Sequence, residues 1–397
     1  MKFCNPLNEH YMLITSRPEV ITSFNGSLSN LKVLQVDSNT TALVMTGLAT
    51  PNGELYNEET AKKPLSTARI YSKLFVRQWD AYITENKSTI FYTTMKRSHG
   101  IFKNNVAPLI NALAGHSVTL ESPVPPFGGA GDFDISKNGI VFVAKDPTLD
   151  PANYTKTDLY FIPLKSFEET KPPSPIMVKT GNLKGYSASP MFSPDAKSVA
   201  FTRMKSIQYE SDKPRLLLIP DITDLSNVQE YFETADGEGS WDLRPEAIVW
   251  SQDGEELFVT AEENGRAKLF KLPASPRHAK DLPVAIVSDG AVSEAKVLPN
   301  NKLLITSTSL IDNGVFSILN PAKPTDVSVI FSSSQNGKAF GLSQNQVEEF
   351  WYAGAEDYSV HTWVMKPSNF DKNKKYPLAY LIHGGVCGFL NHVWESC

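Results

Sequence analysis

The chain has 397 residues, which is too long for one ordinary domain and long enough to bury a large core. Hydrophobic residues make up 41% and charged residues 20%, and the formal net charge is -5, so nothing points to nucleic acid or an anionic membrane as a partner. No apolar run approaches the length of a membrane span, and no Cys/His run has zinc spacing, so we expect no membrane segment, metal or other cofactor.

The first part of the chain carries mixed signals about export. The longest apolar stretch near the N-terminus, residues 11–14, is too short for a signal-peptide core. Four Asn-X-Ser/Thr sequons nevertheless fit a glycosylated extracellular protein. Polar turns between strands explain such tripeptides equally well, so both interpretations stay open. The four asparagines are Asn25, Asn39, Asn86 and Asn153.

Short runs of β-branched and aromatic residues, separated by Pro, Gly, Asn and Asp, predict a mainly β protein. Residues 31–47 and 70–95 are rich in such runs, and we expect them to form one or two groups of strands. Residues 122–131, rich in Pro and Gly, then form a loop.

A unit of strand, tight turn and strand recurs four times after this loop, in residues 133–144, 191–202, 249–260 and 297–306. Ser136, Ser193, Ser251 and Leu298 stand before the turns and are 57, 58 and 47 residues apart. Asn-Gly, Asp-Gly or a proline in the turn lowers the strain of the reversal.

Each unit is followed by another apolar run, and these runs are residues 159–163, 216–220, 269–273 and 315–319. This spacing slightly exceeds that of one four-stranded propeller blade, which leaves room for loop insertions. We therefore predict a β-propeller, with a β-sandwich as the alternative.

The pattern changes near residue 346. Residues 350–352 and 362–365 predict two strands, and a charged turn follows at 371–375. Residues 376–382 are almost continuously apolar, which is typical of a parallel strand covered on both faces. This run leads into His383, Gly384 and Gly385.

Several blocks together resemble the fungal dipeptidyl-peptidase V group of the prolyl oligopeptidase (S9) family. They include Pro-Leu-Ser-Thr-Ala-Arg-Ile-Tyr at 64–71, Val-Arg-Gln-Trp-Asp at 76–80, Pro-Pro-Phe-Gly-Gly-Ala at 125–130, Tyr-Glu-Ser-Asp at 209–212 and His-Gly-Gly at 383–385. The resemblance implies a seven-bladed propeller capping an α/β-hydrolase domain that removes dipeptides from peptide N-termini. It also implies an exported protein that acts on short peptides.

The resemblance divides the chain into an incomplete propeller at residues 1–345, lacking a first blade, and the start of an α/β-hydrolase domain at 346–397. In this fold the nucleophile lies in Gly-x-Ser-x-Gly, downstream of the His-Gly-Gly loop, and the acid and histidine of the triad follow it. We therefore expect a fragment without the Ser-Asp-His triad and without peptidase activity of its own. A non-catalytic propeller that binds ligands is the alternative.

Three further predictions concern site residues. His383, Gly384 and Gly385 form the loop beside the oxyanion site of the intact enzyme. A carboxylate among Glu210, Asp212 and Glu246 is a candidate to hold the free amine of a peptide. Residues 185–189 and 341–345 lack the final glycine of a nucleophile elbow, and the first of these segments is predicted to lead into a strand.

Overall fold

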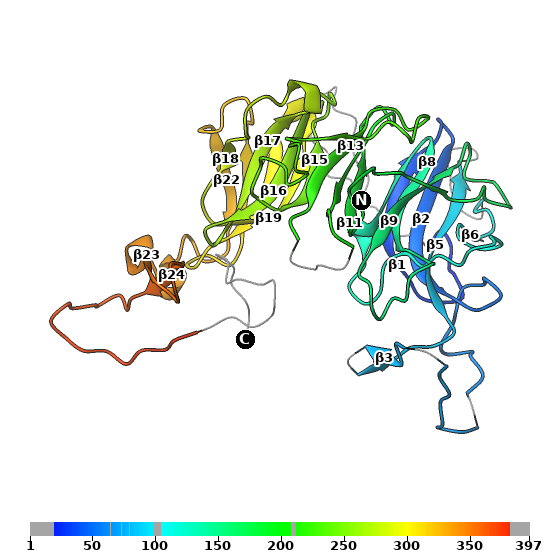
Figure 1. Cartoon of the computed structure of the whole chain (residues 1–397), viewed down its shortest axis with the longest axis horizontal. Coiled ribbons are helices and arrows are strands. Elements are labelled where there is room, and N and C mark those ends of the chain that lie inside the picture. Colours follow the sequence, from blue (N-terminus) through cyan, green and yellow to red (C-terminus); the bar gives the residue numbers. More distant parts are fainter. Residues whose placement is uncertain are drawn as a thin grey trace.

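The computed structural model describes residues 20–63, 65–72, 74–78, 80–97, 105–207 and 212–381. Regular structure in these residues is almost entirely antiparallel β-strand. The helices found there are single 3-10 turns, namely η1 (Ala130–Asp132), η2 (Pro276–His278), η3 (Pro299–Asn301), η4 (Lys338–Phe340) and η5 (Gln344–Gln346). The sheets follow one another across the molecule in chain order (Figure 1).

The first sheet has the strand order β1-β2-β5-β6. Between β2 and β5 the chain leaves the sheet and forms a small hairpin, β3–β4, which projects away from the sheets (Figure 1). The two strand-rich segments upstream of residue 97 therefore build one sheet. Its strands, with the small hairpin, are β1 (Leu28–Gln35), β2 (Thr40–Ala49), β3 (Arg77–Gln78), β4 (Ala81–Tyr82), β5 (Lys87–Lys96) and β6 (Ile110–Asn111).

The second and third sheets each contain four strands in simple sequential order. The second consists of β7 (Phe133–Ser136), β8 (Gly139–Lys145), β9 (Thr157–Pro163) and β10 (Ile176–Met177). The third consists of β11 (Ser187–Phe192), β12 (Val199–Arg203), β13 (Arg215–Ile219) and β14 (Gln229–Glu230).

The fourth and fifth groups of strands repeat this order and are joined into one larger sheet through a parallel pair, Ala267 with Ala291. We call them the fourth and fifth sheets. The fourth consists of β15 (Pro245–Trp250), β16 (Glu256–Glu263), β17 (Arg266–Pro273) and β18 (Ala285–Val287). The fifth consists of β19 (Ala291–Val297), β20 (Leu303–Thr308), β21 (Val315–Leu319) and β22 (Val327–Ser332).

The turns predicted from the repeat connect the first and second strands of the second to fifth sheets, so this prediction is confirmed. In the third sheet, Ser193 Oγ donates to Asp195 and accepts from the backbone N–H of Ser198. In the fourth sheet, Ser251 Oγ makes the same two bonds with Asp253 and Glu256. The polar turn residues of these two copies recur because they satisfy the same backbone groups.

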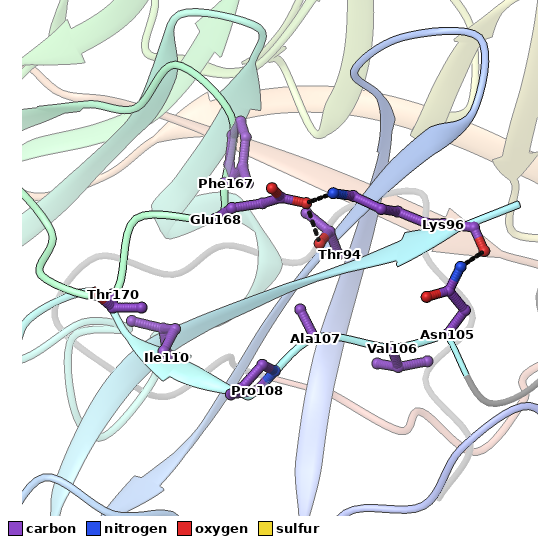
Figure 2. Close-up of a pocket in the computed structure, with 10 residues that line it drawn as sticks. All are labelled: Thr94, Lys96, Asn105, Val106, Ala107, Pro108, Ile110, Phe167, Glu168 and Thr170. Carbon is purple, nitrogen blue, oxygen red and sulfur yellow. Dashed lines mark hydrogen bonds and ion pairs between the residues drawn. The ribbon is translucent and has the colours of Figure 1, made fainter.

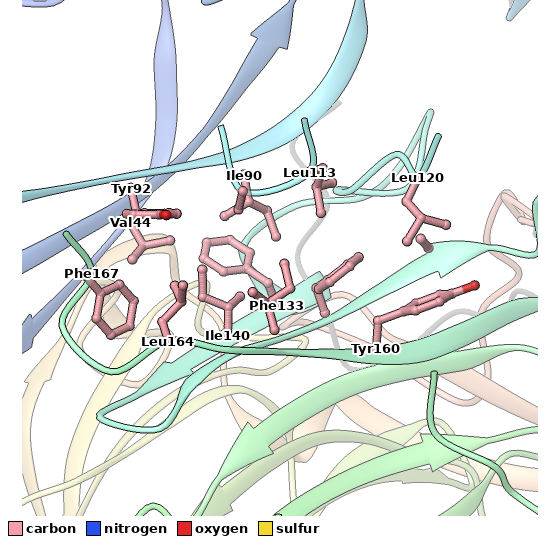
Figure 3. Packing of buried hydrophobic residues seen from close by; sticks show 14 of the residues in the cluster. Val44, Ile90, Tyr92, Leu113, Leu120, Phe133, Ile140, Tyr160, Leu164 and Phe167 are labelled. Carbon is pink, nitrogen blue, oxygen red and sulfur yellow. The ribbon is translucent and has the colours of Figure 1, made fainter. Parts of the chain in front are cut away.

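Side chains alternate between the two faces of each strand, so a strand between two sheets is apolar on both faces. In β8, Ile140 and Phe142 pack in the cluster shared with the first sheet (Figure 3), whereas Val141 and Val143 pack against the third sheet. Two further buried clusters join the third sheet to the fourth and the fourth to the fifth. The continuous apolar runs of the sequence are therefore strands sandwiched between neighbouring sheets.

The first strands of successive sheets pack against one another, β1 against β7, β7 against β11, β11 against β15 and β15 against β19. Hydrogen bonds between repeats connect these strands. The backbone N–H of Phe192 donates to Asp134 (2.8 Å), and Trp250 Nε1 donates to the carbonyl of Met191 (3.1 Å). The partners are 58 and 59 residues apart, so these contacts recur at the same spacing as the repeat in the sequence.

After β22 come β23 (Val347–Ala353) and β24 (Ser359–Met365), which are the two strands predicted here, and they form a separate two-stranded sheet. The predicted strand at 376–382 is wrong for residues 376–381, which have no strand structure, and Leu378 is 86% exposed. A parallel strand of this kind needs neighbouring strands and covering helices. The part of the chain that the structure describes places none beside it.

Candidate functional site

The strand order gives each sheet two unlike ends. We call the end at which the first strands begin the leading face. Because the strands are antiparallel, the loops between second and third strands lie at the same end. The β23–β24 hairpin also lies there, since Arg266, at the start of β17, contacts Glu349 of β23.

A row of titratable residues crosses the leading face from the second to the fourth sheet. We call Asp132, Tyr186, Arg244, Glu246 and Glu262 the acidic rim. Asp132 precedes β7, Tyr186 precedes β11 and Arg244 precedes β15, while Glu246 lies in β15 and Glu262 near the end of β16. The starts of the first strands of the second, third and fourth sheets thus contribute to one polar region.

Glu246 has the strongest claim among the predicted amine-binding carboxylates. Its side chain is 48% exposed, and Arg244 Nε lies 3.8 Å from its carboxylate, beyond hydrogen-bond distance. Desolvation by the surrounding groups raises the pKa of Glu246, the charge of Glu262 raises it further, and Arg244 only partly opposes this. A cationic ligand would therefore stabilise the charged form of this accessible carboxylate.

Asp132 and Tyr186 form the more buried part of the rim. The Asp132 carboxylate accepts a hydrogen bond from the backbone N–H of Val124 at 2.7 Å, but burial still raises its pKa. Burial likewise raises the pKa of Tyr186, and the negative charge of Asp132 adds to this. The charge of Asp132 thus acts on Tyr186 across the rim.

The other two predicted carboxylates are less suitable or lie outside the described residues. Glu210 is outside them. Asp212 accepts a hydrogen bond from the backbone N–H of Ser206 at 2.9 Å and lies 3.9 Å from Arg215 Nη1. Asp212 is therefore already engaged with its own loop and a neighbouring cation.

A buried ion pair lies beneath this face, between the second and third sheets. Arg203 Nη2 is 3.0 Å from Asp158, and both side chains are less than 5% exposed. Arg203 Nη1 also donates to Ser187 Oγ (2.6 Å) and to the carbonyl of Thr157 (2.6 Å). Ser187 is therefore a buried acceptor. It is the first residue of β11, so the segment 185–189 leads into a strand, as predicted.

The structure brings together one serine and histidine that sequence reasoning missed. Ser174 Oγ lies 3.4 Å from His116 Nδ1. The other ring nitrogen, Nε2, lies 3.4 Å from the carbonyl oxygen of Ala112 rather than beside a carboxylate. Ser174 is in the β9–β10 connection, at the end opposite the leading face. The pair thus lacks the orienting acid of a catalytic triad.

Two clefts lie beside the first sheet. One, of about 380 Å³, is at the end opposite the leading face, where Lys96 and Glu168 form an ion pair of 2.7 Å (Figure 2). The other, of about 310 Å³, lies on the leading face between the start of β1 and the loop that contains Pro125, and its lining is uncharged. The second cleft is therefore the one placed on the same face as the acidic rim.

The remaining predicted site residues fall into two groups. His383, Gly384 and Gly385 lie outside the described residues. The sequon asparagines lie in connections next to strands, where Asn25, Asn39 and Asn153 are exposed and Asn86 is half-buried. Within the described ranges, no helix is long and apolar enough to cross a membrane, and no group of three potential metal ligands comes together.

Comparison with known proteins identifies the class of the fold. The structure resembles uncomplexed Pyrococcus horikoshii acylaminoacyl peptidase with a TM-score of 0.54 at 10% identity, over 85% of this chain and 44% of that chain. An acylaminoacyl peptidase in complex with Z-Gly-Gly-Phe-chloromethyl ketone gives 0.53 at 10% identity, over 85% and 43%. At this identity the likeness shows a shared fold. No protein-family model matches the chain.

Relatives found by sequence have much higher identity to this chain than these solved structures have. The chain is 36% identical to dipeptidyl-peptidase 5 of Trichophyton tonsurans over 388 residues, which are 94% of this chain and 50% of the relative. It is 37% identical to that of Arthroderma otae, over 88% of this chain and 47% of the relative. The chain therefore belongs to the dipeptidyl-peptidase 5 group of the prolyl oligopeptidase family, as the sequence predicted, and it spans about half the length of the curated relatives it matches.

Proposed function

We propose that this chain is the substrate-facing part of a serine exopeptidase that releases dipeptides from the N-termini of short peptides. The observation that carries the proposal is the 36% identity to dipeptidyl-peptidase 5 over 94% of the chain. The acidic rim supports it, because a dipeptide-releasing enzyme must recognise a free amine.

We further propose that the five sheets are blades of a β-propeller that occupies residues 1–345, and that an α/β-hydrolase domain begins at 346. Consecutive packing of the first strands supports the propeller, since these strands line the axis in that architecture. The boundary is supported by β23, which begins at Val347 and, among the described residues, pairs only with β24.

Glu246 is our candidate for the residue that holds the peptide amine. A carboxylate that accepts a hydrogen bond from an ammonium group forms a charge-assisted bond, which contributes about 1.5–3 kcal/mol. Its raised pKa makes the interaction sensitive to pH. Protonation removes the negative charge, so amine binding should weaken as pH falls, beginning at a higher pH than for an ordinary glutamate.

Acyl transfer needs a hydroxyl, a base and an orienting carboxylate. The pair formed by Ser174 and His116 does not supply the carboxylate. We propose that His383, Gly384 and Gly385 border the oxyanion site once the triad is supplied, and that the present chain does not form an acyl-enzyme.

Export and glycosylation belong to the same proposal. The four sequon asparagines border strands, and three of them are exposed, which gives an oligosaccharide room to leave the surface. Treatment of the secreted protein with an N-glycosidase should lower its mass at Asn25, Asn39 and Asn153. An unchanged mass would count against these sites.

Calorimetric titration of the purified chain tests the proposal. A tripeptide amide with a free N-terminus should bind roughly tenfold more tightly than its N-acetylated form, because acetylation removes the ammonium charge. Glu246→Gln should abolish this difference. Glu256→Gln is the matched control, because Glu256 pairs with Lys271 (2.9 Å) at the opposite end of the fourth sheet.

Equal binding of the two peptides would favour the alternative, a propeller that binds ligands without recognising an amine. A fluorophosphonate probe and a dipeptidyl nitroanilide provide the second arm of the test. We expect neither labelling nor hydrolysis with this chain. Covalent labelling of any serine would contradict the proposal of inactivity.

A further inference from the structure

The β23–β24 hairpin meets the fourth sheet at the turn between β16 and β17. Arg266, the first residue of β17, lies 2.8 Å from Glu349 of β23 through Nη1. Its guanidinium also lies over the ring of Trp363 of β24, 4.5 Å from the ring centroid. One side chain therefore contacts both strands of the hairpin, through an ion pair and a cation–π interaction.

The backbone beside Arg266 is part of the same contact. Gly265 has φ +66, and a Cβ at this position would lie 2.5 Å from Trp363 Nε1. The indole thus packs directly on the turn, at a distance that only glycine permits. Next to it, His361 Nε2 lies 3.1 Å from the Glu349 carboxylate. We call Gly265, Arg266, Glu349, His361 and Trp363 the corner latch.

The electrostatics of the corner latch are favourable. The hydrogen bond from Arg266 lowers the pKa of Glu349, and the bond from His361 lowers it further. Arg266 is 19% exposed, so this pair is less screened by water than a fully exposed one. Asp289 lies 3.5 Å from Arg266 Nε and adds a second carboxylate on the side of the sheets.

The hairpin on its own is a weak unit of structure. An isolated two-stranded hairpin is at best marginally stable in water. Phe350 and Tyr352, on one face of β23, are 45% and 40% exposed, so this face buries little apolar surface. The other face carries Glu349 and Trp351, and the ring of Trp351 lies 4.8 Å from that of His361. We therefore expect the order of the hairpin to depend on the contacts of this second face, where the corner latch lies.

We propose that the corner latch orders the β23–β24 hairpin and thereby sets the direction in which the chain leaves β24. Gly265 and Arg266 are positioning residues in this scheme. The ordering of the hairpin is independent of the proposed function.

Hydrogen–deuterium exchange of the whole chain tests the latch. Gly265→Ala should accelerate exchange of the β23 and β24 amides roughly tenfold, since the added methyl group displaces Trp363. Gly254→Ala is the matched control. Gly254 is in another turn of the fourth sheet with φ +74, and its Cβ would meet only Pro194 Cδ, at 3.7 Å. Both variants carry the strain of a positive φ, but only the first disturbs the latch.

A second pair of variants leaves the turn unchanged. Arg266→Gln should accelerate exchange of the hairpin amides several-fold, whereas Lys271→Gln removes an ion pair of the same strand that stays within the fourth sheet. Raising the salt concentration to about 1 M should weaken the wild-type latch in the same direction. Arg266→Lys, which keeps the charge but not the planar group, should recover part of the protection.

Hairpin exchange that is unchanged in both Gly265→Ala and Arg266→Gln would overturn the latch. Acceleration that spreads equally over β15–β17 would also overturn it, since it would mean that the fourth sheet itself is destabilised. The exchange measurement does not require catalysis or peptide binding. Its result is therefore independent of the peptide-binding and labelling experiments that test the proposed function.

Discussion

The second sheet and the β23–β24 hairpin are both antiparallel β-structure rich in aromatic and β-branched residues, but they are held in different ways. In β8, Ile140, Val141, Phe142 and Val143 are completely buried, because a sheet packs on each face. In β23, Trp351 is 54% exposed. Similar local sequence thus gives a rigid core strand in one place and a surface strand in the other, and the neighbouring elements decide which.

The two arginine clusters show the same contrast. Arg203 is 3% exposed and joins two sheets through an ion pair and bonds to a hydroxyl and two carbonyl groups. Arg266 is 19% exposed and joins a sheet to a hairpin. Burial raises both the strength of such a pair and the cost of breaking it. Substitution in the sheets should therefore change global stability, whereas substitution at the hairpin should change local order.

The largest effect is expected from Phe142→Ala. Phe142 is completely buried and stacks on Tyr160 with ring centroids 5.4 Å apart. Removing the ring should lower the free energy of unfolding by about 3–5 kcal/mol, measured by urea denaturation. Phe316→Ala is the control, because Phe316 is 39% exposed in the fifth sheet, and it should cost about 1 kcal/mol or less. Equal losses would mean that the two ends of the molecule are packed equally well.

Arg203→Met should come next, with a loss of about 3 kcal/mol, because the carboxylate of Asp158 stays buried without its partner. The comparison is with Lys205→Gln two residues further on. Lys205 pairs with Glu238 at the surface, where its loss should cost less than about 1 kcal/mol. Thermal denaturation followed by circular dichroism measures both. A loss below 1 kcal/mol for Arg203→Met would show that the pair does not hold the second and third sheets together.

A smaller effect, specific to acid, is expected at Asp312. Burial alone would raise the pKa of this carboxyl, but bonds from Ser332, Ser333 and backbone N–H groups outweigh burial and lower it. The folded pKa then lies below the unfolded value, so the contribution to stability is complete above about pH 4 and is lost as pH falls further.

Asp312→Asn should therefore destabilise the fifth sheet by about 2 kcal/mol at neutral pH and by less at pH 3. Urea denaturation at the two pH values measures the difference. Asp326→Asn, at an exposed position in the connection between β21 and β22, is the control and should cost less than about 0.5 kcal/mol. A loss at Asp312 that is as large at pH 3 as at pH 7 would mean that the charge of Asp312 is not what stabilises the β20–β21 turn.

Much of the sheet region could be predicted from the sequence, because its signals are local. The turns after Ser193 and Ser251 and the apolar runs that follow depend on neighbouring residues only, and β21 has the bounds expected for it. The run at 376–381 misled the prediction, because an apolar sequence specifies a buried strand only where neighbours cover it. Whether this segment is exposed depends on the elements around it, and the sequence of the segment alone carries no information about them.

The candidate site was less predictable. Three carboxylates were equal candidates in the sequence, and only the contacts of Asp212 with Ser206 and Arg215 distinguished it from the more open Glu246. The corner latch gave no sequence signal, because Gly265 and Trp363 are almost a hundred residues apart. The ion pair of Arg203 with Asp158 gave no sequence signal either, because the two residues are also far apart in the chain.

The contacts between equivalent repeats have a practical consequence for engineering. Asn138 bonds to the backbone of Ala196, 58 residues away, whereas the N–H of Gln252 bonds to Asn301, only 49 residues away. Adjacent turns thus remain joined although the intervening chain differs by nine residues in length. The connections between second and third strands differ most, because residues 146–156 link β8 to β9 whereas only residues 264–265 link β16 to β17. They lie at the end of the sheets opposite the joined turns, so a short peptide tag or a fluorophore placed in residues 147–155 should leave the junctions between sheets undisturbed.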